Sequence, residues 1–353
     1  MTATSETHFH GGPRAALAVR PFRWWFLGQI TSASGLMTQM VAVGWLVLRW
    51  HGNGVQLGLL SSAGLGPTLV LGLWAGSLID HHDRRVLLIW TQALLAALSL
   101  LLYALIASGS ASYWPLVAIM LAGGIVNALD GPARQIYVLD LVGPERVAGA
   151  VSLYEVILNL SRVLGPAAGG ALLAVSGPAA CVLVNAVTFL APLLVLLRYR
   201  PEGGPARPST RPQPSAAEPD PARRPSALEG IRYAWSQPLL RACLLLAASS
   251  TVLFSPTLFF PLLATRVFQL GGSGYGVLLA LFGVGALPGA LLASRRTPTG
   301  ARVRLLAALT GVAVVVSALA PDQPILFAGI IATGTSSIWM IASANTLVQL
   351  RTA

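Results

Sequence analysis

The sequence predicts an all-α membrane protein with about ten transmembrane helices, and three observations carry this prediction. Of the 353 residues, 55% are hydrophobic and 10% are charged, whereas a soluble domain has about 25% charged residues. The apolar residues form segments of about 20 residues or more, the length that a helix needs to cross roughly 30 Å of hydrocarbon. The basic residues fall between these segments. Because the segments are apolar on all sides, without strict alternation, a transmembrane barrel is excluded.

Ten apolar segments qualify as membrane spans when the chain is followed from its N-terminus. The first comes after three Arg residues and is too long for the core of a cleaved signal peptide, so it is expected to remain as a helix. The ten segments are 24–48, 55–79, 86–107, 115–138, 148–175, 178–197, 239–266, 273–293, 304–320 and 325–349.

Arginine placement predicts the orientation of these spans. All 23 basic residues are Arg, and if the N-terminus is cytoplasmic the outside segments hold Arg49 and Arg266 while the inside segments hold nearly all the others. Because basic loops stay in the cytoplasm, we expect a multi-pass protein of the inner or plasma membrane with both termini cytoplasmic. Membrane topology thus explains the net charge of +11, and no nucleic-acid partner is expected.

A change in composition divides the chain into two bundles. Residues 1–200 are predicted to form an N-terminal six-helix bundle, and residues 226–353 a C-terminal bundle of four helices. Between them, residues 201–225 are rich in Pro and Arg with almost no large apolar side chain, which predicts a flexible cytoplasmic linker. Residues 226–238 have one apolar face and predict a short helix on the inner membrane surface.

No residue pattern indicates catalysis, a metal or a bound cofactor. Cys181 and Cys243 lie within apolar segments and are interpreted as small core residues. The five His show no metal-ligand spacing, and the sequence contains no H-E-x-x-H motif and no nucleophile elbow. The sequence therefore gives no support to an intramembrane enzyme.

The stretch GSLIDHHDRR, residues 76–85, concentrates charge between the second and third spans. It resembles the pattern G-x-L-x-D-R-x-G-R-R that the major facilitator superfamily carries at this place. The matching positions are Gly76, Leu78, Asp80, Arg84 and Arg85. His81 and Asp83 depart from the pattern. The Asp at position 83 resembles the branch of transmembrane secretion effectors that export siderophores and macrolides.

The resemblance implies a role for this stretch as a latch. In transporters similar to this chain, the cluster Gly76, Asp80, Arg84 and Arg85 holds the two halves together in the outward-facing state. The alternative is a plain topology signal, which would need the Arg residues but neither Asp80 nor Gly76. We therefore expect the latch.

Two charged residues lie within the fourth span, where ionisable groups are costly and mark candidate functional sites. Asp130 and Arg134 are four residues apart and can pair on one helix face. Either a structural ion pair or a role in proton coupling or gating accounts for them. Gly131 and Pro132 between them are expected to loosen the helix.

A polar stripe runs along the fifth span. Glu155, Asn159 and Arg162 fall at i, i+4 and i+7 and share one face, which should meet a water-filled cavity or another helix. We expect Glu155 to bind protons, because desolvation favours the neutral form of a carboxyl group. A static pair of Glu155 with Arg162 or Arg134 is the competing account.

The fifth span ends in a series of small residues. Its members are Gly165, Pro166, Gly169 and Gly170. They resemble the signature of drug and metabolite antiporters of the superfamily, which implies a helix bend and export in exchange for protons. A generic seam of small residues between helices is the other interpretation.

The predicted function is a transporter that exports a small amphipathic molecule by alternating access, as a monomer coupled to protons. Aromatic residues that could line its cavity, although core packing accounts for each one alone, are Trp25, Trp45, Phe254, Phe259 and Trp339. Two six-span halves are expected in this superfamily, so the second half appears four spans long and lacks two helices. A truncated, non-transporting or accessory membrane protein is therefore the alternative.

Overall fold

Two compact units, Met1–Pro208 and Ser209–Ala353, make up the computed structural model, and each is described by itself. The described residues are 13–50, 52–199, 235–236, 260, 263–264, 268–295 and 299–352. Among them, eight helices are long and apolar enough to cross a membrane, which confirms the all-helical membrane fold. The segments predicted as linker, surface helix and seventh span lie almost wholly outside the described residues; they are 201–225, 226–238 and 239–266.

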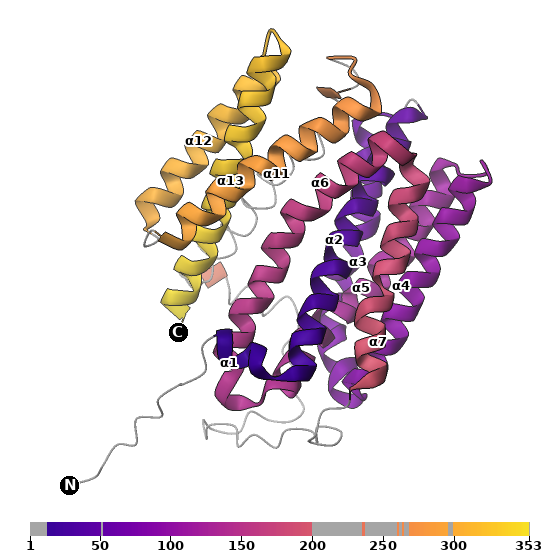
Figure 1. Ribbon diagram of the computed structural model, residues 1–353, viewed down its shortest axis with the longest axis vertical. Coiled ribbons are helices and arrows are strands. Elements are labelled where there is room, and N and C mark those ends of the chain that lie inside the picture. Colours follow the sequence, from indigo (N-terminus) through magenta and orange to yellow (C-terminus); the bar gives the residue numbers. More distant parts are fainter. Residues whose placement is uncertain are drawn as a thin grey trace. The chain divides into compact units, whose positions relative to one another are not determined.

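The N-terminal unit is a bundle of long helices that run back and forth along one direction (Figure 1). Its elements are α1 (Pro13–Ala18), α2 (Arg20–Arg49), α3 (Gly54–His81), α4 (Arg84–Ala107), α5 (Tyr113–Val142), the short 3₁₀ helix η1 (Pro144–Arg146), α6 (Val147–Thr188) and α7 (Leu190–Arg198). The first four predicted spans match α2 to α5.

Side-chain caps fix where two of these helices begin. Asn53 and Gln56 form a capping box at α3, in which each side chain accepts a hydrogen bond from the other residue's backbone N–H. Asp83 caps α4, because its carboxylate accepts hydrogen bonds from the N–H groups of Arg85 (2.8 Å) and Val86 (3.3 Å). Asp83, which departs from the superfamily pattern, therefore stabilises the start of the third span.

A single glycine divides α6 into two spans. Gly177 has φ 79° and ψ −178°, a backbone conformation that glycine adopts without steric cost. The chain reverses there (Figure 1), so residues 147–176 form one span. Residues 178–188 continue through α7 as the next one. The predicted boundary between spans 148–175 and 178–197 is confirmed.

One end of the N-terminal unit collects its arginine residues. Helices α2, α4 and α6 begin at this end, whereas α3, α5 and α7 finish there (Figure 1). The arginines at these helix ends are Arg20, Arg84, Arg85, Arg146 and Arg198. We call this end of the unit the basic end.

Glycine allows close contact between neighbouring helices in both units. In the N-terminal unit, a Cβ atom on Gly124 of α5 would lie 2.5 Å from the Gly64 carbonyl oxygen of α3. The C-terminal unit consists of α11 (Gly271–Arg295), α12 (Gly300–Ala318) and α13 (Gln323–Thr352) in the described residues. There the Thr335 hydroxyl donates a 2.8 Å hydrogen bond to the Gly285 carbonyl of α11. Small residues therefore hold the helices together where apolar burial alone gives little preference.

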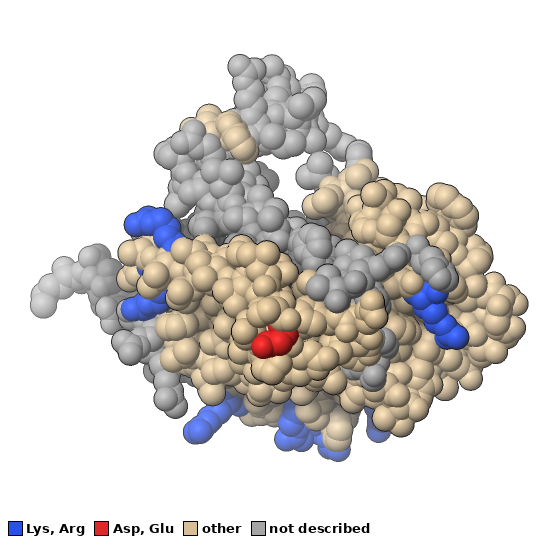
Figure 2. Space-filling model, turned by 90° about the horizontal axis from the view of Figure 1, so that it is seen from above, with Lys and Arg blue, Asp and Glu red and all other residues tan. Residues whose placement is uncertain are grey.

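The face seen in Figure 2 carries few charged side chains among the described residues. Large apolar side chains stand exposed on the helices instead, among them Leu69 at 83%, Trp90 at 71% and Trp114 at 69%. A soluble protein rarely exposes apolar surface on this scale, so these faces are expected to contact lipid.

Candidate functional site

A buried carboxylate lies between α4 and α5 of the N-terminal unit. Asp130 is fully buried, and its Oδ1 accepts hydrogen bonds from the Thr91 hydroxyl (2.7 Å) and the Gln92 side-chain amide (2.8 Å). The Arg134 guanidinium pairs with its other oxygen. The predicted pair on one face of the helix is therefore present, and we call these four residues the Asp130 cluster.

The Asp130 cluster contains a charge that is held away from water. A buried ion pair is strongly destabilised when one partner is lost, because the other charge remains without compensation. Thr91 and Gln92 supply neutral hydrogen bonds on the α4 side. Such an arrangement makes the charge of this carboxylate consequential for the packing of α4 against α5.

The charged stretch between α3 and α4 is bound to the basic end of the same unit. The Arg84 guanidinium donates 3.1 Å hydrogen bonds to both carboxylate oxygens of Asp140, near the end of α5. Arg85 donates from Nε to the Leu196 carbonyl (2.7 Å) and from Nη2 to the Leu197 carbonyl (3.2 Å), both in α7. The two arginines thus connect the start of α4 to the ends of α5 and α7.

Two residues of the predicted latch belong to α3. Gly76 and Asp80 lie in its last two turns, and the side chain of Asp80 lies outside the described residues. The latch therefore remains a prediction for all four of its residues.

The polar stripe of the fifth span falls on the first part of α6. The side chains of Glu155 and Asn159 lie outside the described residues, while Arg162 is half-buried. The structure consequently leaves the expected proton-binding role of Glu155 as a prediction.

The small residues at the end of the fifth span pack against α2. A Cβ atom on Gly165 would lie 2.7 Å from the Ser34 carbonyl oxygen, and one on Gly169 would lie 3.0 Å from the Thr38 Cα. The Thr38 hydroxyl donates a 3.0 Å hydrogen bond to the Gly165 carbonyl. Pro166 and Gly170 lie within the same continuous helix. These contacts form a tight seam of small residues, which is the packing that both interpretations of this stretch require.

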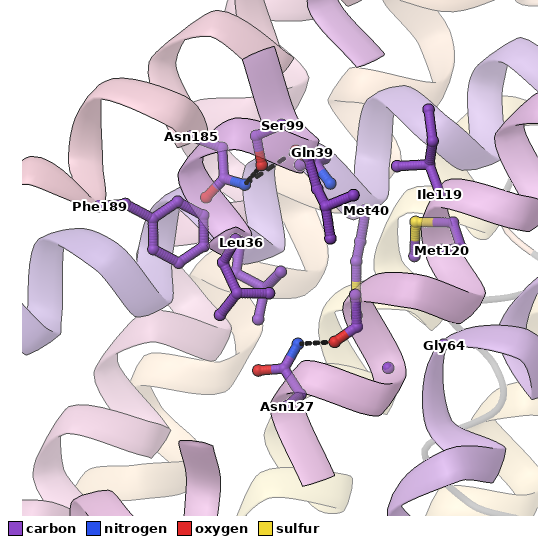
Figure 3. A pocket seen from close by; sticks show the side chains of 14 residues that line it. Leu36, Gln39, Met40, Gly64, Ser99, Ile119, Met120, Asn127, Asn185 and Phe189 are labelled. Atoms are coloured by element: carbon purple, nitrogen blue, oxygen red, sulfur yellow. Dashed lines mark hydrogen bonds between the residues drawn. The ribbon is translucent and has the colours of Figure 1, made fainter. Parts of the chain in front are cut away.

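A cavity of about 50 Å³ lies inside the N-terminal unit (Figure 3). Its apolar walls include Leu36, Met40, Leu98, Ile119, Met120 and Phe189. No charged side chain lines it among the described residues. A site of this volume has room for water or for a few atoms of a ligand.

Amide and hydroxyl groups form the polar part of this cavity. The Asn185 side-chain amide donates hydrogen bonds to Gln39 Oε1 (2.8 Å) and to the Ser99 hydroxyl (3.1 Å), as Figure 3 shows. All three residues are buried, and Asn185 Oδ1 has no hydrogen-bond partner within the described part of the chain. Sequence reasoning missed these residues, which we call the amide cluster. Their polarity within apolar spans was the available signal.

The cavity and the Asp130 cluster are stacked along α4 and α5. Leu95 and Asn127 line the cavity, and each lies three residues from a member of the cluster, Gln92 and Asp130 respectively. Three residues of helix correspond to about 4.5 Å. A change at Asp130 can therefore reach the cavity through one turn of either helix.

The aromatic residues predicted from sequence do not line this cavity within the described part of the chain. Trp25 is fully buried in a core cluster, and Trp339 packs against a core in the C-terminal unit. Trp45 is partly buried. Phe254 and Phe259 lie outside the described residues. The aromatic side chain that lines the cavity is Phe189, which the sequence analysis did not select.

The helical bundle is that of a multi-pass membrane protein, and its match to a family model identifies a transporter of the major facilitator superfamily. Residues 11–353 match the model of the family described as transmembrane secretion effector, and the chain belongs to this family. It is a transporter family, so the protein is not an enzyme.

Two curated relatives are similar to this chain. It is 29% identical over 308 residues to the multidrug efflux pump Tap of Mycolicibacterium fortuitum, covering 84% of this chain and 73% of that protein. It is 31% identical over 160 residues to the staphyloferrin A transporter of Staphylococcus aureus, covering 44% of this chain and 40% of that one.

Solved structures share the fold. A bacterial homologue of the human lysosomal transporter Spinster, inward-facing and occupied, has a TM-score of 0.67 at 16% identity, with 93% of this chain and 74% of that chain covered. A bacterial homologue of the iron transporter ferroportin, inward-facing, has a TM-score of 0.59 at 16% identity, with 94% and 84% covered.

Proposed function

We propose that this protein exports a small, largely apolar molecule by alternating access, in exchange for protons that bind Asp130. The observation that carries the proposal is the stacking of the cavity on the Asp130 cluster, one helical turn apart along α4 and α5. A coupled carrier needs its substrate and proton sites to influence each other, and this spacing provides the contact.

The walls of the cavity favour a neutral amphipathic substrate. Apolar side chains dominate them, while Gln39, Ser99 and Asn185 place hydrogen-bonding groups at one end. Because the cavity has room for only a few atoms of a ligand, it would take the apolar end of the substrate and orient it through these polar groups. A relative named as a multidrug efflux pump supports export as the direction of transport.

Protonation of Asp130 would change the packing around the cavity. A neutral carboxyl group no longer balances the charge of Arg134, and its hydrogen bonds to Thr91 and Gln92 weaken. Buried charges of this kind bias a helix pair between two arrangements. Proton binding and release would thereby drive the change between inward-facing and outward-facing states.

The basic end of the N-terminal unit is proposed to lie in the cytoplasm, together with both termini and the linker 201–225. Its Arg84–Asp140 pair has partly exposed side chains, 19% and 25% respectively, so its net contribution to stability is small. Contacts of this strength can break and re-form in a transport cycle. With Gly76 and Asp80 they make the proposed latch.

Transport into liposomes tests the proposal. The purified chain would be reconstituted with the neutral lipophilic dye Nile red as probe, and dye movement would be recorded with and without a pH gradient. We expect gradient-dependent transport that Asp130→Asn reduces by roughly 100-fold, because the variant has no carboxylate to titrate. Asp322→Asn, which alters an exposed helix cap, is the matched control and should transport normally.

Two outcomes would contradict the proposal. Equal pH-driven transport in Asp130→Asn and in the unaltered protein would remove Asp130 as the coupling site, and loss in Glu155→Gln instead would assign the role to Glu155. Absence of any gradient-dependent movement of Nile red by the unaltered protein would favour a non-transporting or accessory protein.

A further inference from the structure

Two stripes of polar side chains lie along α4 and α5 beside the seam between these helices. On α5, Asp130, Arg134 and Tyr137 follow at intervals of four and three residues and so share one helix face. On α4, Arg85 and Gln92 are seven residues apart and also share a face. The stripes therefore run from the Asp130 cluster toward the basic end.

Contacts between α4 and α5 occur at both ends of the seam. At the inner end of the seam, Gln92 donates its 2.8 Å hydrogen bond to Asp130. At the basic end, Arg84 contacts Asp140 at 3.1 Å. Asp130 and Asp140 are ten residues apart, which corresponds to about 15 Å along the helix, and the side chain of Asp140 is 25% exposed. The seam thus extends from a fully buried carboxylate to one that reaches water.

Between these ends, three polar atoms lack a hydrogen-bond partner among the residues that the structure describes. They are Gln92 Oε1, Arg134 Nε and the Tyr137 hydroxyl, which are all buried. Buried polar groups in folded proteins are almost always hydrogen-bonded, often through water. An acceptor, a donor and a hydroxyl that can do both are the groups that hold a file of water molecules.

Tyr137 lies where such a file would meet the charges of the basic end. It is 1% exposed and packs in a cluster with Leu88 and Trp25, so apolar side chains surround it. Its hydroxyl lies within electrostatic range of Arg85, Asp140 and Asp83. The Tyr137 side chain therefore separates the buried carboxylate from the exposed end of the seam.

We propose that the α4–α5 seam is the path by which protons travel between Asp130 and the basic end, with the Tyr137 hydroxyl as its relay. This inference rests on the proposed function, because it presumes that Asp130 is protonated during transport. Water molecules held by Gln92, Arg134 and Tyr137 would occupy this path.

The transfer is balanced at each step. The carboxyl O–H bond of Asp130 breaks as its proton passes to the first water, which releases another proton along the file. The Tyr137 oxygen receives a proton from the file while its own hydroxyl proton passes to water at the Asp140 side. Tyr137 is neutral before and after, and one proton leaves the seam. Arg134 keeps its charge and positions the water.

Other charged groups face the seam and set its field. Arg134 pairs with Asp130, and Arg84 and Arg85 stand with Asp83 and Asp140 at the basic end. From α6, Tyr154 lies within electrostatic range of Arg134. Glu155 follows it in sequence.

Time-resolved infrared spectroscopy after a pH jump tests the relay on the purified full-length chain. The carboxyl band of Asp130 would be assigned by its loss in Asp130→Asn. We expect Tyr137→Phe to slow the response of this band by roughly tenfold or more and to leave its final amplitude unchanged. Tyr103→Phe, the same change on α4 at the end away from the basic end, is the matched control and should keep the original rate.

The outcomes separate the relay from the proposed function. An unchanged rate in Tyr137→Phe overturns the relay while Asp130 still titrates. A changed final amplitude in Tyr137→Phe with an unchanged rate also overturns it, because the residue then acts through structure alone. Absence of any pH-dependent band that Asp130→Asn removes would overturn the proton role of Asp130, and the proposed coupling with it.

Discussion

The Asp130 cluster and the amide cluster occupy neighbouring levels of the same helix bundle but use different chemistry. The first holds a full charge pair on α5 that is hydrogen-bonded to α4, while the second joins α2, α4 and α6 through neutral groups. Both include side chains of α4, namely Gln92 and Ser99, seven residues apart. The charge pair has a protonation state that can change, whereas the amides can only orient a ligand. We therefore propose that coupling belongs to the Asp130 cluster and recognition to the amide cluster.

The largest effect is expected from removing one charge of the Asp130 cluster. Arg134→Met should lower the free energy of unfolding by about 3–5 kcal/mol, because Asp130 stays buried without its partner. Thermal unfolding in detergent measures this. The double variant Asp130→Asn with Arg134→Met should recover most of the loss, and a double variant as unstable as the single one would show that the charge pair is not the cause.

A smaller effect is expected from the amide cluster. Asn185→Leu removes the donors to Gln39 and Ser99 and should cost about 1–3 kcal/mol in the same assay, because buried partners are left unsatisfied. Nile red transport should fall while its dependence on the pH gradient persists. Thr310→Val is the control, since its buried hydroxyl bonds the Leu306 carbonyl of its own helix in the C-terminal unit. Loss of the gradient dependence in Asn185→Leu would argue against separate roles for the amide cluster and the Asp130 cluster.

Close packing beside the amide cluster gives a third test. A Cβ atom on Gly35 would lie 3.0 Å from Asn185 Oδ1 and would also contact the Thr188 hydroxyl. Gly35→Ala should therefore destabilise the protein by about 1 kcal/mol and reduce Nile red transport. Gly58→Ala on α3, where a Cβ atom would meet open space, should leave both unchanged. Equal effects of the two substitutions would show that contact with Asn185 is unimportant.

The smallest change in stability is expected at the basic end. Arg84→Gln removes a partly exposed ion pair and should change the free energy of unfolding by less than about 1 kcal/mol. If the pair belongs to a latch, transport should change much more than stability does. If Arg84→Gln transports at the unaltered rate, Arg84 is not part of a latch and acts as a topology signal.

Much of the fold was predictable, because hydropathy and arginine placement follow directly from the cost of burying polar groups in lipid. The Asp130–Arg134 pair was predictable as well, since the two residues are four apart on one helix. Their partners Thr91 and Gln92 were not, because a contact between α4 and α5 depends on tertiary packing.

The amide cluster and the partner of Arg84 were missed for a related physical reason. Gln39 and Asn185 are 146 residues apart, and neutral amides cost less to bury than charges, so their local sequence carries a weak signal. Asp140 lies 56 residues from Arg84, near the end of a different helix. No short-range sequence pattern therefore links Arg84 to Asp140.

Simultaneous recording of Nile red movement and internal pH in proteoliposomes tests the central claim most directly. The account predicts that dye transport by the unaltered protein is accompanied by a change in internal pH. In Asp130→Asn, proton movement should be lost, while Asp322→Asn should behave like the unaltered protein. Proton movement at the original rate in Asp130→Asn would contradict the account.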